Sequence, residues 1–193
     1  MATKTRKPRR NPAGPDFSNL LKVLRRQVPD RPTLFEFFLN GPLYESLAAP
    51  LTHAKDDVLS YLRVVIRAFG NAGYDYAGLG ASDFGFPAGQ RHREKTVSLN
   101  DGSVISDRAG FEAYNWRGPD DFDYSRVDIL AKDLADGQKF VVHGPGGVLE
   151  NVIGLVGYDQ LCFLLADDPD LVKDIFDAVG SRLVRHYEIA RGF

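Results

Sequence analysis

The sequence is poor in the features that mark several special classes of protein. It contains a single cysteine, Cys162, so no disulfide can form within one chain. We expect its thiol to be buried and structural, because it lies in the apolar run LCFLLA. No apolar stretch approaches the roughly 20 residues that a membrane-spanning helix needs. Together these absences predict a soluble protein of a reducing, cytoplasmic compartment that does not enter a membrane.

Signatures of nucleotide and metal sites are also missing. The glycine-rich turn HGPGG at 143–147 fits neither the GxxxxGK pattern of a phosphate loop nor a GxGxxG fingerprint. The histidines and carboxylates are not spaced as the ligands of a zinc site would be. We therefore expect no nucleotide cradle, no metal ligands and no cofactor held by this chain alone.

What is present resembles an ordinary globular protein. The chain has 193 residues, of which 44% are hydrophobic and 26% charged, with a formal net charge of -2. This composition can bury a sizeable core, and the length suits one domain. It is short for a closed (β/α)8 barrel, which typically needs about 250 residues.

The N-terminal segment 1–15 differs from the rest. It begins MATKTRKPRR and continues with proline and glycine, a composition too polar to pack, so we predict a flexible basic tail. A basic arm can bind nucleic acid by neutralising phosphates, but the remaining chain is acidic. A solvated tail is the favoured interpretation.

The rest of the chain alternates between helical and strand-like patterns. Helical periodicity and capping residues predict helices at 17–26, 56–72 and 148–157, and a long one from Pro169 through Tyr187. Apolar and aromatic runs predict core strands at 33–39, 74–81 and 139–144, and the Asp101-Gly102 turn predicts a hairpin over 96–106. Such alternation is typical of α/β proteins with a parallel sheet, either doubly wound or a barrel.

Three stretches carry a family resemblance. They are NLLKVLRRQVPDRPTLFEFF at 19–38, NDGSVISDRAGFEAYNW at 100–116, and GPGGVLENVIGLVGYDQLCFLLADDPDLVKDIFDAVGSRLVRHYE at 144–188. They resemble the N-terminal part of the uroporphyrinogen decarboxylase (URO-D) superfamily, over about residues 17–190. The superfamily contains the heme-pathway decarboxylase and corrinoid-dependent methyltransferases, built on a (β/α)8 TIM barrel. The resemblance implies that residues 16–193 hold about the first three βα units, a partial barrel with a hairpin excursion.

The resemblance also guides the expected function. The decarboxylases carry an arginine-rich RQAGRYxPE segment that grips porphyrinogen carboxylates, whereas FEFFLNGPLYESL here has no arginine. We therefore expect methyl transfer, or action on a small carboxylated substrate, in preference to a uroporphyrinogen-type lyase. Zinc and a corrinoid, with a corrinoid protein as partner, would belong to a full-length methyltransferase. The alternative is a truncated, non-catalytic half-barrel that acts as a binding or assembly module and self-associates through an open sheet edge.

Two residues are candidates for the chemistry. His143 directly follows the third expected strand, and the carboxyl ends of parallel strands face the active site in barrels. Glu36 interrupts an apolar aromatic strand, where a carboxylate is costly unless it is paired or faces water in a pocket. The alternative for His143 is a hydrogen bond to a neighbouring loop. We predict that both residues position or activate a small-molecule substrate.

Other residues are candidates for substrate binding. In the turn, Gly146 and Gly147 could present backbone amides to a substrate carboxylate, or could serve only as a tight corner. Glu150 and Asn151 follow in the first helical turn, where Glu150 could equally be a capping group. Asp83, just beyond the second expected strand, resembles by position the pyrrole-binding aspartate of the decarboxylases. By contrast, Asp75 is expected to be structural, and His53 and His186 are expected at the surface.

Overall fold

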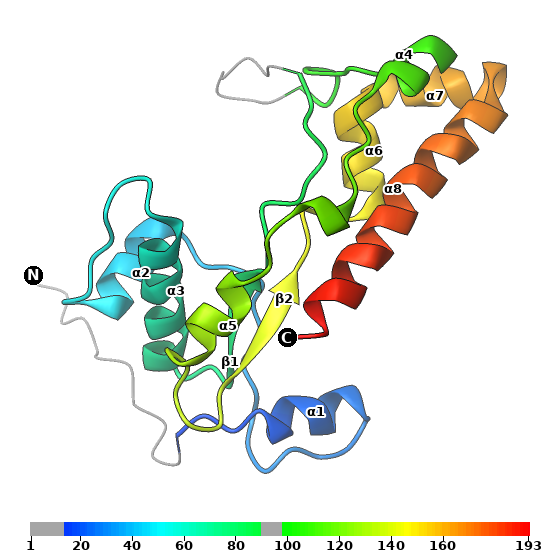
Figure 1. Cartoon of the computed structure of the whole chain (residues 1–193). Coiled ribbons are helices and arrows are strands. Elements are labelled where there is room, and N and C mark those ends of the chain that lie inside the picture. Colours follow the sequence, from blue (N-terminus) through cyan, green and yellow to red (C-terminus); the bar gives the residue numbers. More distant parts are fainter. Residues whose placement is uncertain (1–13, 90–97) are drawn as a thin grey trace, which may run out of the picture. The chain divides into compact units, whose positions relative to one another are not determined.

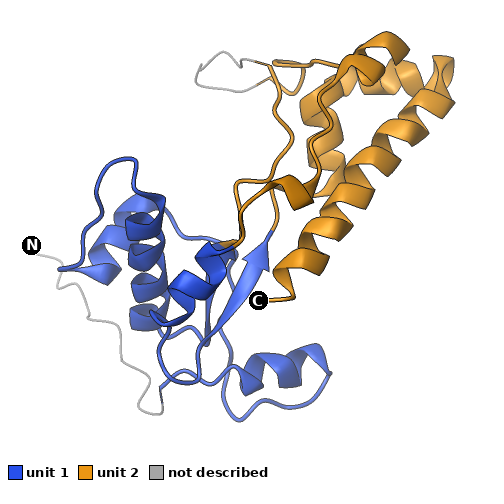
Figure 2. Ribbon diagram, viewed as in Figure 1, with its two compact units in different colours: residues 1–79, 125–143 blue, residues 80–124, 144–193 orange. Residues whose placement is uncertain are grey.

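The computed structural model describes residues 14–89 and 98–193. The basic tail, apart from its last two residues, and the first two residues of the expected hairpin lie outside these ranges. Contacts divide the chain into two compact units, and each unit is built from two separate stretches of sequence (Figure 2). Unit 1 comprises residues 1–79 and 125–143, and unit 2 comprises residues 80–124 and 144–193.

Unit 1 is mixed α/β and contains a two-stranded parallel sheet (Figure 1). Among its helices, α2 and α5 both contact α3. The predicted α/β class with parallel pairing is therefore confirmed, while the partial barrel stays a prediction. The elements are α1 (Ser18–Leu24), α2 (Gly41–Ala48), α3 (Val58–Ala72), β1 (Tyr76–Gly80), α5 (Arg126–Ala131) and β2 (Lys139–His143).

The ends of α3 follow from its sequence. The Asp57 carboxylate accepts a hydrogen bond from the Ser60 backbone N–H at 3.0 Å and caps the first turn. This bond is the main reason that the pKa of Asp57 lies below its ordinary value. At the other end, Gly73 adopts φ 94°, the left-handed conformation that glycine tolerates best. Buried side chains such as Val65 and Phe69 lie on the face that packs inward.

The predicted strand at 33–39 was wrong. These residues form no strand, and most of them are exposed, with Phe37 at 60% and Phe38 at 77% of their full accessible surface. They contact β1 through the side chain of Tyr76 and not through a ladder of backbone hydrogen bonds. The apolar composition therefore indicated a contact with the core. It could not show whether a neighbouring strand is available for backbone hydrogen bonds.

Unit 2 is helical. Its core is lined by apolar side chains from α6, α7 and α8, together with Phe84 and Ile105 from the first stretch. The long helix α8 begins as predicted: Asp168 caps it by accepting from the Leu171 N–H at 3.0 Å, and Pro169 is the first helical residue. The elements are α4 (Arg108–Ala113), the 3₁₀ turn η1 (Pro119–Asp121), α6 (Val148–Val156), α7 (Tyr158–Asp167) and α8 (Pro169–Ala190).

Three further predictions in unit 2 were wrong. Cys162 is exposed, because it lies on α7 beside Leu161 and not on the buried face of the helix. His186 is buried, only 1% exposed, and its Nδ1 lies 2.7 Å from the Tyr124 hydroxyl. In the described part of the expected hairpin, 98–106, there is a turn at Asp101-Gly102 but no strand. That segment instead bonds to the end of α6, where the backbone N–H of Ile105 donates to the Leu155 carbonyl at 2.9 Å.

Within the described ranges, no single helix is both long and apolar enough to cross a bilayer. Taken together, α6 and α7 satisfy the length and composition test, but the pair is bent by 93°.

Candidate functional site

The candidate site in unit 1 is centred on Gly78, in the middle of β1. A Cβ atom on Gly78 would lie 2.9 Å from the backbone oxygen of Phe37 and 3.8 Å from Cδ2 of His143. The extended segment around Phe37, strand β1 and the end of β2 therefore meet at this glycine. Because any side chain here would push the Phe37 carbonyl away, Gly78 permits the close approach of these three segments.

Tyr76 fixes the segment next to this glycine. Its ring is 1% exposed, and its hydroxyl both accepts from the Glu36 backbone N–H and donates to the Glu36 carbonyl oxygen. The Phe35 ring packs against it, with the two centroids 5.4 Å apart. Burial raises the pKa of the Tyr76 hydroxyl, so it stays protonated and able to donate at neutral pH. Sequence reasoning missed this residue, although a tyrosine inside an otherwise apolar strand usually needs a hydrogen-bond partner.

His143 is the last residue of β2, and its side chain is exposed at the carboxyl end of the strand. This is the position that its place in the sequence predicted. Glu36 is also exposed, and the expectation that its carboxylate sits inside an apolar strand was wrong. The negative charge of Glu36 adds a small upward contribution to the pKa of Tyr74, which burial raises. The structure thus brings the Glu36-Phe37 backbone and the His143 ring to the same glycine.

The glycine-rich turn belongs to unit 2 and closes onto its own helix. Gly146 has φ 106°, and a Cβ on Gly147 would clash with the carboxylate of Glu150. The side-chain amide of Asn151 donates to the Gly147 carbonyl at 2.8 Å. The conformation of the turn therefore favours glycine at Gly146, whereas at Gly147 a side chain would only have to move the Glu150 carboxylate. A substrate carboxylate would have to displace the Glu150 carboxylate from the start of α6.

One more contact holds the turn. The Gly144 backbone N–H donates to the Tyr187 hydroxyl at 2.9 Å, and a Cβ on Gly144 would lie 2.8 Å from that oxygen. Tyr187 lies near the end of α8, where it is 45% exposed and its hydroxyl anchors the turn.

Asp83 also lies in unit 2, exposed, three residues beyond the end of β1. Its neighbour Ser82 accepts a hydrogen bond from the Phe84 backbone N–H at 3.2 Å, and Phe84 packs into the core of unit 2. The candidate residues therefore form two groups. Glu36 and His143 belong to unit 1, while Gly146, Gly147, Glu150, Asn151 and Asp83 belong to unit 2.

Asp75 is buried, as a structural role requires. It accepts a hydrogen bond from the Asp16 backbone N–H at 2.7 Å and forms an ion pair with Arg31. The Asp75 carboxylate thereby connects Asp16, which precedes α1, and Arg31, which follows α1, to the start of β1. These contacts agree with the expected structural role of Asp75.

Neither metal ligands nor related proteins help to define the site. Over residues 14–89 and 98–193, no three histidine, cysteine or carboxylate side chains cluster as a metal site would require. Comparisons of the chain with protein-family models, with curated proteins and with solved structures gave no match.

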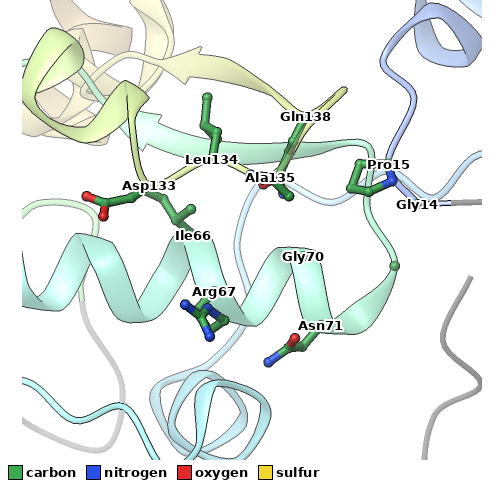
Figure 3. A pocket seen from close by; sticks show the side chains of 11 residues that line it. Gly14, Pro15, Ile66, Arg67, Gly70, Asn71, Asp133, Leu134, Ala135 and Gln138 are labelled. Carbon is green, nitrogen blue, oxygen red and sulfur yellow. Dashed lines mark hydrogen bonds between the residues drawn. The ribbon is translucent and has the colours of Figure 1, made fainter.

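A cavity of unit 1 lies at the opposite end of its strands (Figure 3). It has a volume of about 440 Å³ and is bordered by Gly73, which precedes β1, and Gln138, which precedes β2. Its other polar lining residues include Arg67 and Asn71 from α3. Ligands of parallel α/β sheets usually bind at the carboxyl ends of the strands, so this cavity is separate from the candidate site around His143.

Proposed function

We propose that this chain contributes the first βα units of an enzyme of the URO-D superfamily, acting in methyl transfer or on a small carboxylated substrate. The observation that carries the proposal is the exposed His143 at the carboxyl end of a parallel strand, beside Gly78. This end of a parallel sheet is where enzymes of the barrel class place their reactive side chains. The quoted sequence resemblance is the second support.

The two candidate side chains suit different tasks. Protonated His143 can donate a charge-assisted hydrogen bond to a substrate carboxylate. Glu36 repels such a group, so we assign it to accept a proton or a hydrogen bond from the opposite end of the substrate. Tyr76 and Gly78 do not react but hold the Glu36 backbone in place.

A porphyrinogen is a poorer fit as substrate. The stretch between Arg31 and Arg63 contains no arginine, and a molecule with many carboxylates needs several such cations. The described residues also do not offer a set of ligands for zinc. The proposed substrate is therefore small and carries one or two carboxylates.

The proposal is tested by following the His143 imidazole in NMR spectra of the full chain during titration with acetate and succinate. We expect the His143 resonances to move as the carboxylate binds. His143→Gln should abolish binding, whereas His53→Gln, which removes another exposed histidine of unit 1, should leave it unchanged. If the His143 resonances do not move, or if His53→Gln weakens binding equally, the assignment is wrong.

The second candidate function is a non-catalytic module that binds another copy of the chain. The exposed apolar run Leu34, Phe35, Phe37 and Phe38 favours it, because clustered apolar side chains of this size mark interaction surfaces. Sedimentation of the wild type and of a Phe37→Ser/Phe38→Ser double variant distinguishes the two. Self-association that the double variant abolishes would support the module, and a monomer at all concentrations would contradict it.

A further inference from the structure

The cavity at the amino ends of β1 and β2 has the features of a binding site for a small anion. One wall is the last two turns of α3, and the other is the loop that leads into β2. Arg67 and Asn71 leave α3 on the same side, one helical turn apart, and in this view they point away from the loop that carries Gln138 (Figure 3). Both walls belong to unit 1.

Arg67 supplies a positive charge to the border of the cavity. Among the residues that the structure describes, it makes no ion pair or hydrogen bond, and its side chain is exposed. Asp133 also lines the cavity, but its carboxylate is paired with Arg63 of α3 at 3.1 Å, so those two charges cancel. The remaining local charge is that of Arg67, whose planar guanidinium is suited to bidentate contact with a carboxylate or a phosphate.

The opposite wall is held in place by its own hydrogen bonds. Gln138 is buried, its amide nitrogen donates to the Tyr76 carbonyl at 3.2 Å, and its oxygen accepts from the Ala135 N–H at 3.2 Å. The Asn71 amide nitrogen donates one hydrogen to the Leu47 carbonyl at 2.8 Å, which leaves its second hydrogen for a ligand. Two of the polar groups that border the cavity, Gln138 and Asn71, are therefore held in place by hydrogen bonds.

Gly70 is the feature that fold stability does not explain. A glycine inside a helix destabilises it by about 0.5–1 kcal/mol relative to alanine. A Cβ on Gly70 would meet no backbone, and its nearest neighbours would be the Gln138 amide atoms at 3.7 and 3.9 Å. An alanine would thus fit without strain and would strengthen α3. The glycine instead leaves the cavity open beside Gln138.

We propose that this cavity binds a small molecule through a carboxylate or phosphate group, with Arg67 as the counterion and the Asn71 amide as a second donor. Gly70 provides the space in which the rest of the ligand lies. The site is independent of the proposed function, because it uses none of the residues around Gly78 and His143.

The test is a titration of the ¹⁵N-labelled full chain with inorganic phosphate and, separately, with acetate, at low ionic strength. A single charge-assisted pair predicts a millimolar Kd, so titration to about 20 mM should shift amide signals of α3 and of the loop at 133–138. We expect Arg67→Gln to weaken binding about tenfold. Arg25→Gln removes an exposed arginine of α1 outside the cavity and should change nothing.

A second variant tests the role of the cavity itself. Gly70→Leu keeps Arg67 and favours the helix, but its side chain extends into the space, so it should raise the melting temperature and weaken binding. A preference for phosphate over acetate, or the reverse, identifies the ligand's anionic group. The proposal is overturned if neither anion shifts these signals, or if Arg67→Gln and Arg25→Gln weaken binding equally. The His143 titration has a separate readout, so failure of one proposal leaves the other standing.

Discussion

The packing around Gly78 predicts a large effect from the smallest possible substitution, Gly78→Ala. The added Cβ would lie 2.9 Å from the Phe37 oxygen, whereas a carbon and a carbonyl oxygen in contact are about 3.3–3.6 Å apart. The segment must therefore move by about half an ångström, which strains the hydrogen bonds between the Glu36 backbone and the Tyr76 hydroxyl. We expect the free energy of unfolding to fall by about 1–3 kcal/mol, the usual range for overpacking.

Urea unfolding measures this change, and hydrogen exchange of residues 34–38 reports where it acts. The matched control is Gly180→Ala in α8, where a Cβ meets nothing within 4 Å. That variant should be more stable than the wild type, by up to about 1 kcal/mol. If Gly78→Ala unfolds at the same urea concentration as the wild type, and exchange at 34–38 is unchanged, the close approach at Gly78 is not a constraint on the fold.

Three other predictions concern unit 2. Asp168→Ala removes the cap that accepts from the Leu171 N–H and should lower the unfolding free energy by about 1 kcal/mol in urea melts; Asp168→Asn, which keeps the acceptor, should lose much less. Cys162 is exposed, so a thiol reagent should label the folded protein without denaturant, and labelling only after unfolding would contradict the structure. The hydrogen-bonded Arg185 guanidinium lowers the pKa of Asp120. The ion pair therefore stabilises the fold above pH about 4, the ordinary carboxyl range, and this stabilisation is lost as the pH falls through the lowered pKa. NMR titration should show the Asp120 pKa rising in Arg185→Gln, and an unchanged value would exclude the pair.

The elements that the sequence predicted well are those with local signals at both ends. Helix α3 ends at Gly73, and α8 begins with an Asp168 cap followed by Pro169, as their sequences indicate. Strands β1 and β2 were found because short apolar runs follow a helix in each case. Local chemistry decides these boundaries, so no knowledge of the tertiary contacts was needed.

The errors arose where tertiary contacts decide the outcome. Leu34 to Phe38 have the composition of a strand, but a strand needs a backbone partner, and here the side chain of Tyr76 takes that place. His186 could have been found, since it continues the buried series of Val179 and Leu183 along α8. For His186 and for Cys162, the prediction of burial relied on the type of side chain and not on its position around the helix.

The candidate site, too, could be predicted from the sequence only in part. The position of His143 at the end of β2 followed from strand order alone. The meeting of the Phe37 carbonyl, Gly78 and the His143 ring could not be predicted, because it depends on the path of an irregular segment. The cavity beside Gly70 gives only one weak signal in the sequence, a glycine within a helical pattern.

The division of each unit into two stretches of chain also governs how the protein can form during synthesis. Unit 1 needs β2, so it can be completed only after the ribosome has passed residue 143. When the β2 segment leaves the ribosome, residues 80–124 have already left it. Phe84 and Ile105 share a buried core with Leu171 and Ile175 of α8, so this core is incomplete until α8 has also been made. During that interval apolar side chains face the solvent, so the nascent chain is at risk of aggregation until α8 leaves the exit tunnel. Slower translation after residue 124 would prolong this risk, and a chaperone that binds apolar segments would reduce it.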